Sequence, residues 1–150
     1  MQQLQSYEEM SFKEELWNAI THGAGFLISI PVTVLLIIHA SSMNSPVHIV
    51  TFSIFGSSVI LLFLMSTLLH SMPVKYKRFF AILDHSSIYI LIAGTYTPFL
   101  LIAIGGALGI TLLCIIWSIA LFGVVFKCYF IDRFETLSSA LYIAMGWLIV

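Results

Sequence analysis

Ionisable and hydroxyl side chains interrupt the apolar stretches of this sequence at helical spacings. Glu15, Asn18 and His22 follow one another after three and four residues, which places them on one face of a helix. Ser66 and His70 are four residues apart and share a face of another helix. A charged group at the centre of a membrane helix costs about 2.5–3.5 kcal/mol, so we treat these residues as functional candidates.

A carboxylate and a further imidazole follow at Asp84 and His85. Zinc binds His nitrogen and carboxylate oxygen, and at catalytic sites it keeps one position for water. Bound zinc lowers the pKa of that water to about 7, and Ser or Asp groups nearby can orient the water or move its proton. Adjacent residues point about 100° apart on a helix, so we assign the role at such a site to Asp84 rather than His85.

Each histidine also has a structural interpretation, either as an interfacial residue or as a partner in an interhelical hydrogen bond. We favour that interpretation for His39, His48 and His85, and to a lesser degree for His22. For His70 we favour a functional role, because Ser66 precedes it by one helical turn and Asp84 follows across the next connection.

The helices that must position these residues are membrane-spanning. Of the 150 residues, 60% are hydrophobic and only 9% are charged, against roughly 25% charged in soluble domains. No Asp, Glu, Lys or Arg occurs from Leu16 to Val74 or from His85 to Phe126. Such runs belong in a bilayer and exclude a soluble domain. A net charge of −1 with six basic residues also argues against nucleic acid as a partner.

Five apolar segments can be assigned, each long enough to cross a bilayer except the last. They are about Trp17–Ile38, Ile49–His70, Leu83–Ile104, Leu108–Phe126 and a fifth from near Thr136. Their short connections predict an all-α integral membrane fold, an antiparallel bundle of transmembrane helices. The fifth segment is still apolar at Val150, so we expect a C-terminally truncated piece of a longer protein.

The basic residues predict the orientation. With five alternating spans, all six Lys and Arg residues lie on one membrane face, which the positive-inside rule makes cytoplasmic. We therefore expect a plasma-membrane protein with a cytoplasmic N-terminus. Residues 1–16 are predicted as an amphipathic N-terminal segment, since Ser6–Asn18 has the pattern of a helix lying at the membrane surface, and residues 17–150 as the transmembrane domain.

Three motifs resemble those of one known family. Glu15-Leu-Trp-Asn18-Ala-Ile-Thr21-His22 is similar to the E-x-x-N-x-x-T-H opening of the hemolysin III family, within the progestin and adipoQ receptor superfamily. Ser66-Thr-Leu-Leu-His70 resembles its S-x-x-x-H, and the stretch from Leu83 through Asp84 to Pro98 resembles its third helix. The resemblance extends from about Glu14 to Val150.

This resemblance implies a seven-helix membrane protein, of which about five helices are present here, with zinc near the cytoplasmic face. It implies that His70 is a zinc ligand, that Asp84 and Ser66 act on the bound water, and that Glu15, Asn18 and His22 support the site. The family's other two ligands form an H-x-x-x-H in a seventh helix, which this sequence lacks. We therefore expect the chain alone to bind zinc weakly or not at all.

Three functions are compatible with these observations. The first is zinc-dependent hydrolysis of a lipid amide or similar bond within the membrane, and the second is a cytolytic or pore-forming hemolysin. The third is a membrane receptor or regulator without chemistry. Each has membrane lipids as partners and leaves oligomerisation open.

Overall fold

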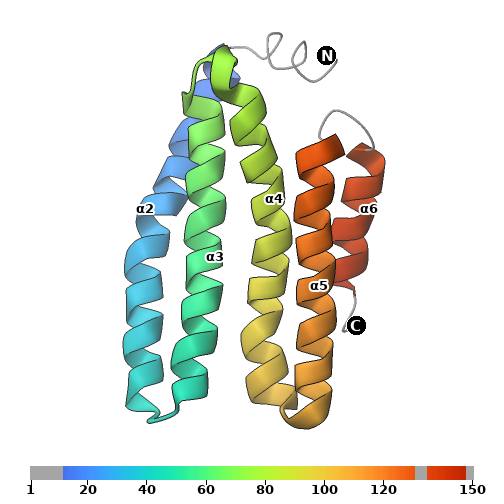
Figure 1. The fold of residues 1–150 in the computed structure, drawn as a ribbon. Helices are drawn as coiled ribbons and strands as arrows, with labels where there is room; N and C mark the ends of the chain where they lie inside the picture. The colour runs from blue at the N-terminus through green and yellow to red at the C-terminus, as the bar shows by residue number, and fades with distance from the viewer. Residues whose placement is uncertain (1–11, 131–134, 148–150) are drawn as a thin grey trace.

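A computed structural model describes residues 12–130 and 135–147, and these residues form an all-helical bundle (Figure 1). The elements in chain order are α2 (Phe12–Ser42), α3 (Pro46–Ser71), α4 (Val74–Pro98), the π-helix η1 (Phe99–Ile104), α5 (Gly106–Phe130) and α6 (Glu135–Gly146). Apart from η1, which continues α4, consecutive helices run in opposite directions and are joined by short connections (Figure 1). The predicted antiparallel all-α bundle is confirmed.

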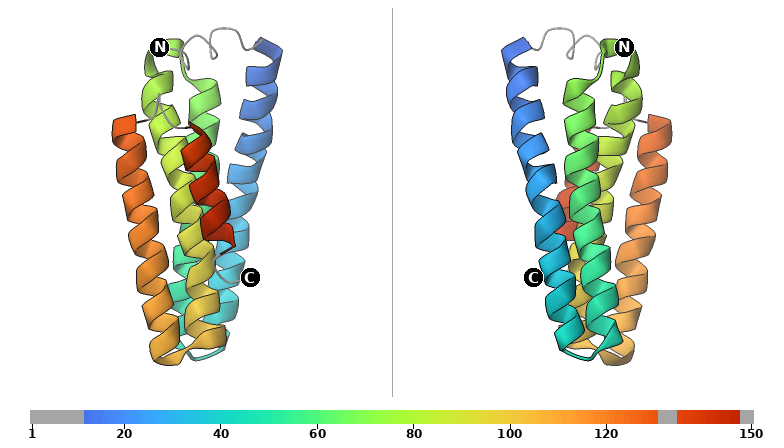
Figure 2. Two further views of the ribbon diagram at one scale, coloured as in Figure 1. Left: turned by 90° about the vertical axis from the view of Figure 1, so that its right-hand side faces the viewer. Right: turned by 90° about the vertical axis from the view of Figure 1, so that its left-hand side faces the viewer.

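The four long helices pack in chain order, each against the next, and α6 packs against both α4 and α5. The two side views show α6 crossing one face of the row, in front of α4 (Figure 2). Among the described elements, the backbone of α2 packs closely only against α3. Much of the apolar surface of α2 is therefore exposed, including Leu27, Ile28 and Leu35, each more than 60% exposed.

Four of the described helical segments are long and apolar enough to cross a membrane: Phe12–Ser42, Pro46–Ser71, Val74–Ile104 and Gly106–Phe130. The apolar part of α6, Leu137–Gly146, is shorter. The first four predicted spans therefore match four helices. Residues 148–150, the end of the fifth predicted span, lie outside the described residues. So do residues 1–11 of the predicted N-terminal segment, while Phe12–Leu16 belong to α2.

The third spanning helix begins nine residues earlier than the apolar pattern predicted, at Val74 rather than near Leu83. Pro73 occupies the N-cap position, where the missing proline N–H leaves no gap in the helix hydrogen bonds. Lys75, Lys77 and Arg78, which lie between the second and third predicted spans, are therefore helical. Lys75 is exposed, but Lys77 is buried against the neighbouring helices.

The connection between the third and fourth spans depends on backbone conformations and contacts that favour glycine. After Pro98 the chain continues as η1, which ends with the Gly105 N–H donating to the Leu100 carbonyl at 2.9 Å. Gly105 and Gly106 then adopt φ values of 65° and 59°. A Cβ on Gly109 would lie 2.2 Å from the Leu100 carbonyl oxygen, so α5 can approach η1 this closely only with glycine there.

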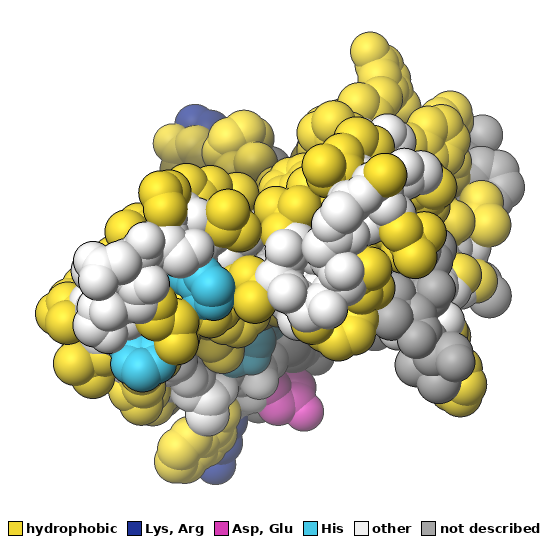
Figure 3. Space-filling view, turned by 90° about the horizontal axis from the view of Figure 1, so that it is seen from below, with side chains coloured by type: hydrophobic (Ala, Val, Ile, Leu, Met, Phe, Trp, Pro, Cys, Tyr) yellow, Lys and Arg dark blue, Asp and Glu magenta, His cyan; other side chains and the backbone are white. Residues whose placement is uncertain are grey.

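The described Lys and Arg residues are confined to one end of the bundle, where α2 and α4 begin and α3 and α5 end; we call it the charged end. The basic residues described by the structure all lie there: Lys13, Lys75, Lys77, Arg78 and Lys127. Seen from the opposite end, the nearest surface is hydrophobic, uncharged polar and His side chains, with Lys and Arg only behind it (Figure 3). This distribution agrees with the predicted clustering of basic residues on one face; Arg133 lies outside the described residues.

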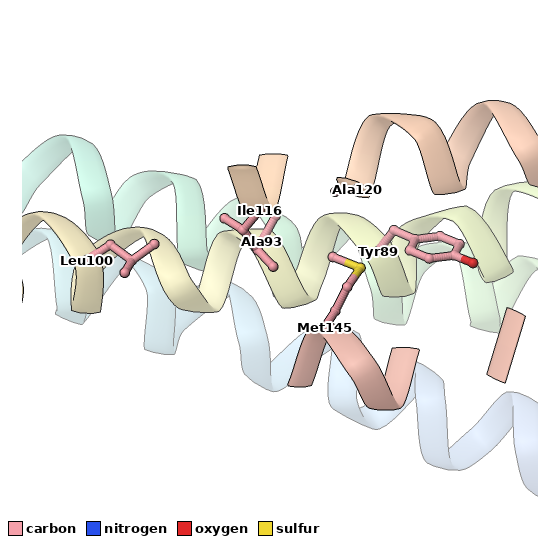
Figure 4. Close-up of a cluster of buried hydrophobic side chains, with 6 residues drawn as sticks. All are labelled: Tyr89, Ala93, Leu100, Ile116, Ala120 and Met145. Carbon is pink, nitrogen blue, oxygen red and sulfur yellow. The ribbon is translucent and has the colours of Figure 1, made fainter. Parts of the chain in front are cut away.

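The large apolar core lies between α4, η1, α5 and α6. Its fully buried members come from these four elements (Figure 4): Tyr89, Ala93, Leu100, Ile116, Ala120 and Met145. The α2–α3 interface buries small and hydroxyl residues instead, including Ser29, Thr33, Thr51 and Gly56. The polar candidates of the sequence belong mainly to this second, small-residue side.

Candidate functional site

Three helices meet at the charged end through a carboxylate shared by two basic side chains. The Glu15 Oε2 atom of α2 lies 3.3 Å from the Nδ1 atom of His70, which is the second-to-last residue of α3. Glu15 Oε1 accepts a hydrogen bond from Lys77 Nζ, in the first turns of α4. The three side chains are only 13%, 13% and 8% exposed, respectively. The structure therefore joins two of the candidate residues, Glu15 and His70, through direct contact.

The His22 ring of α2 also packs against the His70 ring. The two ring centroids are 5.8 Å apart with the planes at 68°, and the Phe63 ring lies 6.2 Å from His22 in an edge-on arrangement. The Nδ1 atom of His22 is buried and has no hydrogen-bond partner among the described atoms. Glu15 and His22, seven residues apart, thus both contact His70, as expected for two residues on one helix face.

Ser66 and Asn18 lie close to this group along the chain. Ser66 is 4% exposed and lies one turn before His70 on α3, facing the bundle interior. Asn18 is partly buried on α2, and its backbone carbonyl accepts a hydrogen bond from the Thr21 hydroxyl at 3.1 Å. Both residues occupy the charged half of the bundle.

Asp84 lies deeper and faces a different helix. It is ten residues after the start of α4, about 15 Å along the helix axis. The Tyr142 side chain of α6 is close enough to interact electrostatically with its carboxylate. The Tyr142 hydroxyl donates to the neighbouring His85 carbonyl at 3.0 Å. Asp84 thus lies in the same half of the bundle as His70 but about two helical turns further in, on the side that packs against α6.

A pocket of about 490 Å³ opens beside the Glu15 carboxylate at the charged end. Its lining comes from the start of α2, the end of α3 and the start of α4: Phe12, Glu15, Leu16, Ala19, His70, Ser71, Met72, Pro73, Val74 and Lys77. Only three of these side chains are ionisable, and they are the three joined through Glu15. The pocket therefore opens directly beside these three side chains.

Comparison with known proteins identifies the family. A sequence profile for the family described as "Haemolysin-III related" matches residues 10–150. The chain belongs to the hemolysin III family. It is 55% identical over 139 residues to "Hemolysin-3" of Bacillus cereus, covering 92% of this chain and 64% of the relative. It is 57% identical over 141 residues to "Hemolysin-3 homolog" of Bacillus subtilis (strain 168), covering 93% of this chain and 66% of that relative. The chain thus spans about two thirds of the length of these relatives.

The described part of this hemolysin III chain does not by itself supply a complete zinc site. Among residues 12–130 and 135–147, no group of three His, Cys, Asp or Glu side chains is arranged to hold a metal ion. His70 and His22 are adjacent imidazoles, and His22 has an unsatisfied buried nitrogen, but the nearest carboxylate is engaged by Lys77. These side chains therefore suit part of a zinc site rather than a complete one.

Two functional candidates of this hemolysin III chain were missed from the sequence. Lys77 lies in the connection between the second and third predicted spans, although its four-residue spacing to Ala81 is compatible with one face of a longer helix. Tyr142 was not singled out because tyrosine is common in apolar helices. No local pattern would have paired it with Asp84, since 57 residues separate Tyr142 from His85, whose carbonyl it contacts.

Proposed function

We propose that this hemolysin III chain forms most of a multi-pass plasma-membrane protein that hydrolyses lipid amide bonds at a zinc site near the cytoplasmic face. The observation that best supports this proposal is the placement of His70, whose Nδ1 atom meets the Glu15 carboxylate in a largely buried position. A zinc-bound histidine typically bonds a carboxylate through its other ring nitrogen. When bound, zinc supplies a water nucleophile at neutral pH.

In this proposal the side chains of the chain have distinct roles. His70 contributes one metal ligand, and the other ligands come from sequence beyond the described residues. Asp84 and Ser66 hold or move the proton of the attacking water, while Glu15, Asn18 and His22 support the site from α2. The pocket of about 490 Å³ admits the polar end of a lipid at the level of Glu15. The substrate is therefore a lipid whose amide lies near its headgroup.

The orientation in the membrane is part of the proposal. The described basic residues lie at the charged end, which the positive-inside rule assigns to the cytoplasm. The Glu15–His70–Lys77 contact would then face the cytoplasmic leaflet. Labelling of a single cysteine introduced at exposed Lys75 from either side of sealed vesicles measures this directly, and labelling from outside intact cells would contradict it.

The hydrolase proposal is tested with the chain extended to the length of its relatives and reconstituted in nanodiscs. We expect bound zinc and turnover of a lipid amide, with turnover at least about 100-fold lower in both His70→Ala and Asp84→Asn. His39→Ala, at the opposite end of α2, is the control and should retain activity. Turnover that survives both substitutions would overturn the proposal. The 150-residue chain alone should bind zinc weakly or not at all.

A second candidate function is permeabilisation of membranes, which the Bacillus cereus relative's name, "Hemolysin-3", suggests. The observation that favours it is the exposed apolar face of α2, which could pack against another copy in the bilayer. Dye release from liposomes at increasing protein-to-lipid ratios tests it. Release that rises more steeply than the protein concentration would favour an assembled pore, and intact vesicles at high loading would exclude it.

A further inference from the structure

The His70–Glu15 contact determines which ring nitrogen of His70 carries a proton. Nδ1 lies 3.3 Å from a carboxylate oxygen, and an ionised carboxylate only accepts hydrogen bonds. Nδ1 must therefore be the donor. A neutral imidazole carries one N–H, so the lone pair is left on Nε2, on the opposite side of the ring.

Lys77 holds the carboxylate in this role. Its ammonium donates to Oε1 of Glu15, while Oε2 faces His70, so the two oxygens of one carboxylate serve two different helices. The Lys77 side chain is 8% exposed, and lysine is rarely buried unless it is paired. The Lys77 ammonium at one oxygen fixes the rotation of the carboxylate. Glu15 then accepts the hydrogen bond from His70 Nδ1 through its other oxygen.

The orientation of the His70 ring is favoured by its contacts with α2. A flipped ring would place a carbon atom at the carboxylate and lose a charge-assisted hydrogen bond, which is about twice as strong as a neutral one. His22 also lies edge-on to the ring, with the two centroids 5.8 Å apart. Two side chains of α2, Glu15 and His22, thus contact this one ring.

We propose that Glu15, anchored by Lys77, is the positioning residue that fixes His70 as the Nδ1–H tautomer and so presents Nε2 as its free donor atom. This inference rests on the proposed function only in taking Nε2 as a metal ligand. The tautomer of His70 is a property of the metal-free chain. It assigns to Lys77 a role that neither the family motifs nor the sequence spacing indicated.

The direct test is ¹⁵N NMR of the metal-free, histidine-labelled chain in nanodiscs, with the His70 signals assigned by their loss in His70→Gln. We expect protonated Nδ1 and unprotonated Nε2 in the wild type. In Glu15→Gln, whose amide can donate as well as accept, the tautomer ratio should shift by about tenfold toward Nε2–H. Lys77→Met should shift it in the same direction by less. Glu14→Gln, the adjacent exposed carboxylate, should leave it unchanged.

Wild-type spectra decide the matter even if a variant fails to fold. Protonated Nε2 with bare Nδ1, or a ratio unaffected by both Glu15→Gln and Lys77→Met, would overturn the proposal. In the extended chain, Glu15→Gln should also weaken zinc binding by about 10–100-fold, with the His70 ligand still present. If the extended chain does not hydrolyse lipid amides, the proposed function is wrong but the tautomer result still stands. If turnover is intact but His70 has the other tautomer, only the positioning role is refuted.

Discussion

The two sides of this bundle are packed by opposite means. Between α2 and α3 the buried residues are small or carry hydroxyls, and a Cβ on Gly56 would lie 2.3 Å from the Thr33 side chain. Between α4, α5 and α6 the buried core also contains large side chains, led by Tyr89 and Met145, beside Ala93 and Ala120. Small residues let the backbones of the first side approach each other, whereas large side chains fill much of the space in the second.

The difference follows from the bilayer as a solvent. Lipid tails are as apolar as leucine, so moving apolar side chains from lipid to protein gains little, and close packing and polar contacts drive association. The hydroxyls of Ser29 and Ser58 bond to carbonyls of their own helices at 2.7 and 2.6 Å, so they can face a neighbouring helix without needing a partner there. The helices on the side that carries Glu15, His22 and His70 are thus held together by close backbone packing and by charged contacts.

We expect the largest loss of stability when the carboxylate that joins three helices is removed. Glu15→Gln leaves the ammonium of Lys77, 8% exposed, without this carboxylate, and we expect stability to fall by about 3 kcal/mol. The midpoint of SDS-induced unfolding in bicelles measures it. Because the loss comes from the remaining charge, Glu15→Gln combined with Lys77→Met should recover most of it. A double variant as unstable as the sum of the single variants would show that charge does not organise this end.

The large-residue side should respond to lost volume. Met145 is 1% exposed within the α4–α5–α6 core, so Met145→Ala leaves a cavity and should lower stability by about 2 kcal/mol in the same assay. Ile143→Ala on the same helix is the control, because Ile143 is 64% exposed and its removal leaves no internal cavity. Equal effects at the two positions would mean that α6 is not packed as described.

The small-residue side should respond in the opposite sense, to added volume. Gly56→Val would place a Cβ 2.3 Å from Thr33 Cγ2 and 2.9 Å from Thr33 Cβ, so α2 and α3 must separate. We expect a loss of about 1–2 kcal/mol. Gly146→Val is the matched control, since no described atom lies within 4 Å of a Cβ there. If Gly56→Val were neutral, close backbone approach would not be what holds α2 on α3.

Much of the architecture could be predicted from the sequence because a spanning helix is a local property. Four long apolar segments with few charges specify four helices whatever their neighbours are. It could also be predicted that Glu15 and His22 lie near His70 together, since helical periodicity puts the first two on one face. The roles of zinc, Ser66 and Asp84 stay predictions.

Contacts between distant segments were harder to predict from the sequence. The start of α4 at Val74 was hidden by its basic residues, because charge in a connection and charge on an emerging helix end look alike in sequence. The proximity of Asp84 to Tyr142 depends on how α6 packs against α4, which no spacing encodes.

By itself, the sequence of this hemolysin III chain determined how many long helices form, how they alternate across the membrane, and which end carries the charge. The length of an apolar segment and the basic residues beside it are properties of that segment alone. They can therefore be recognised without knowing which other segments it packs against. Only the tertiary structure decided that one carboxylate is shared by His70 and Lys77, since that depends on the depth and rotation of three helices at once. Those quantities are set by close packing between helices, to which every buried side chain contributes.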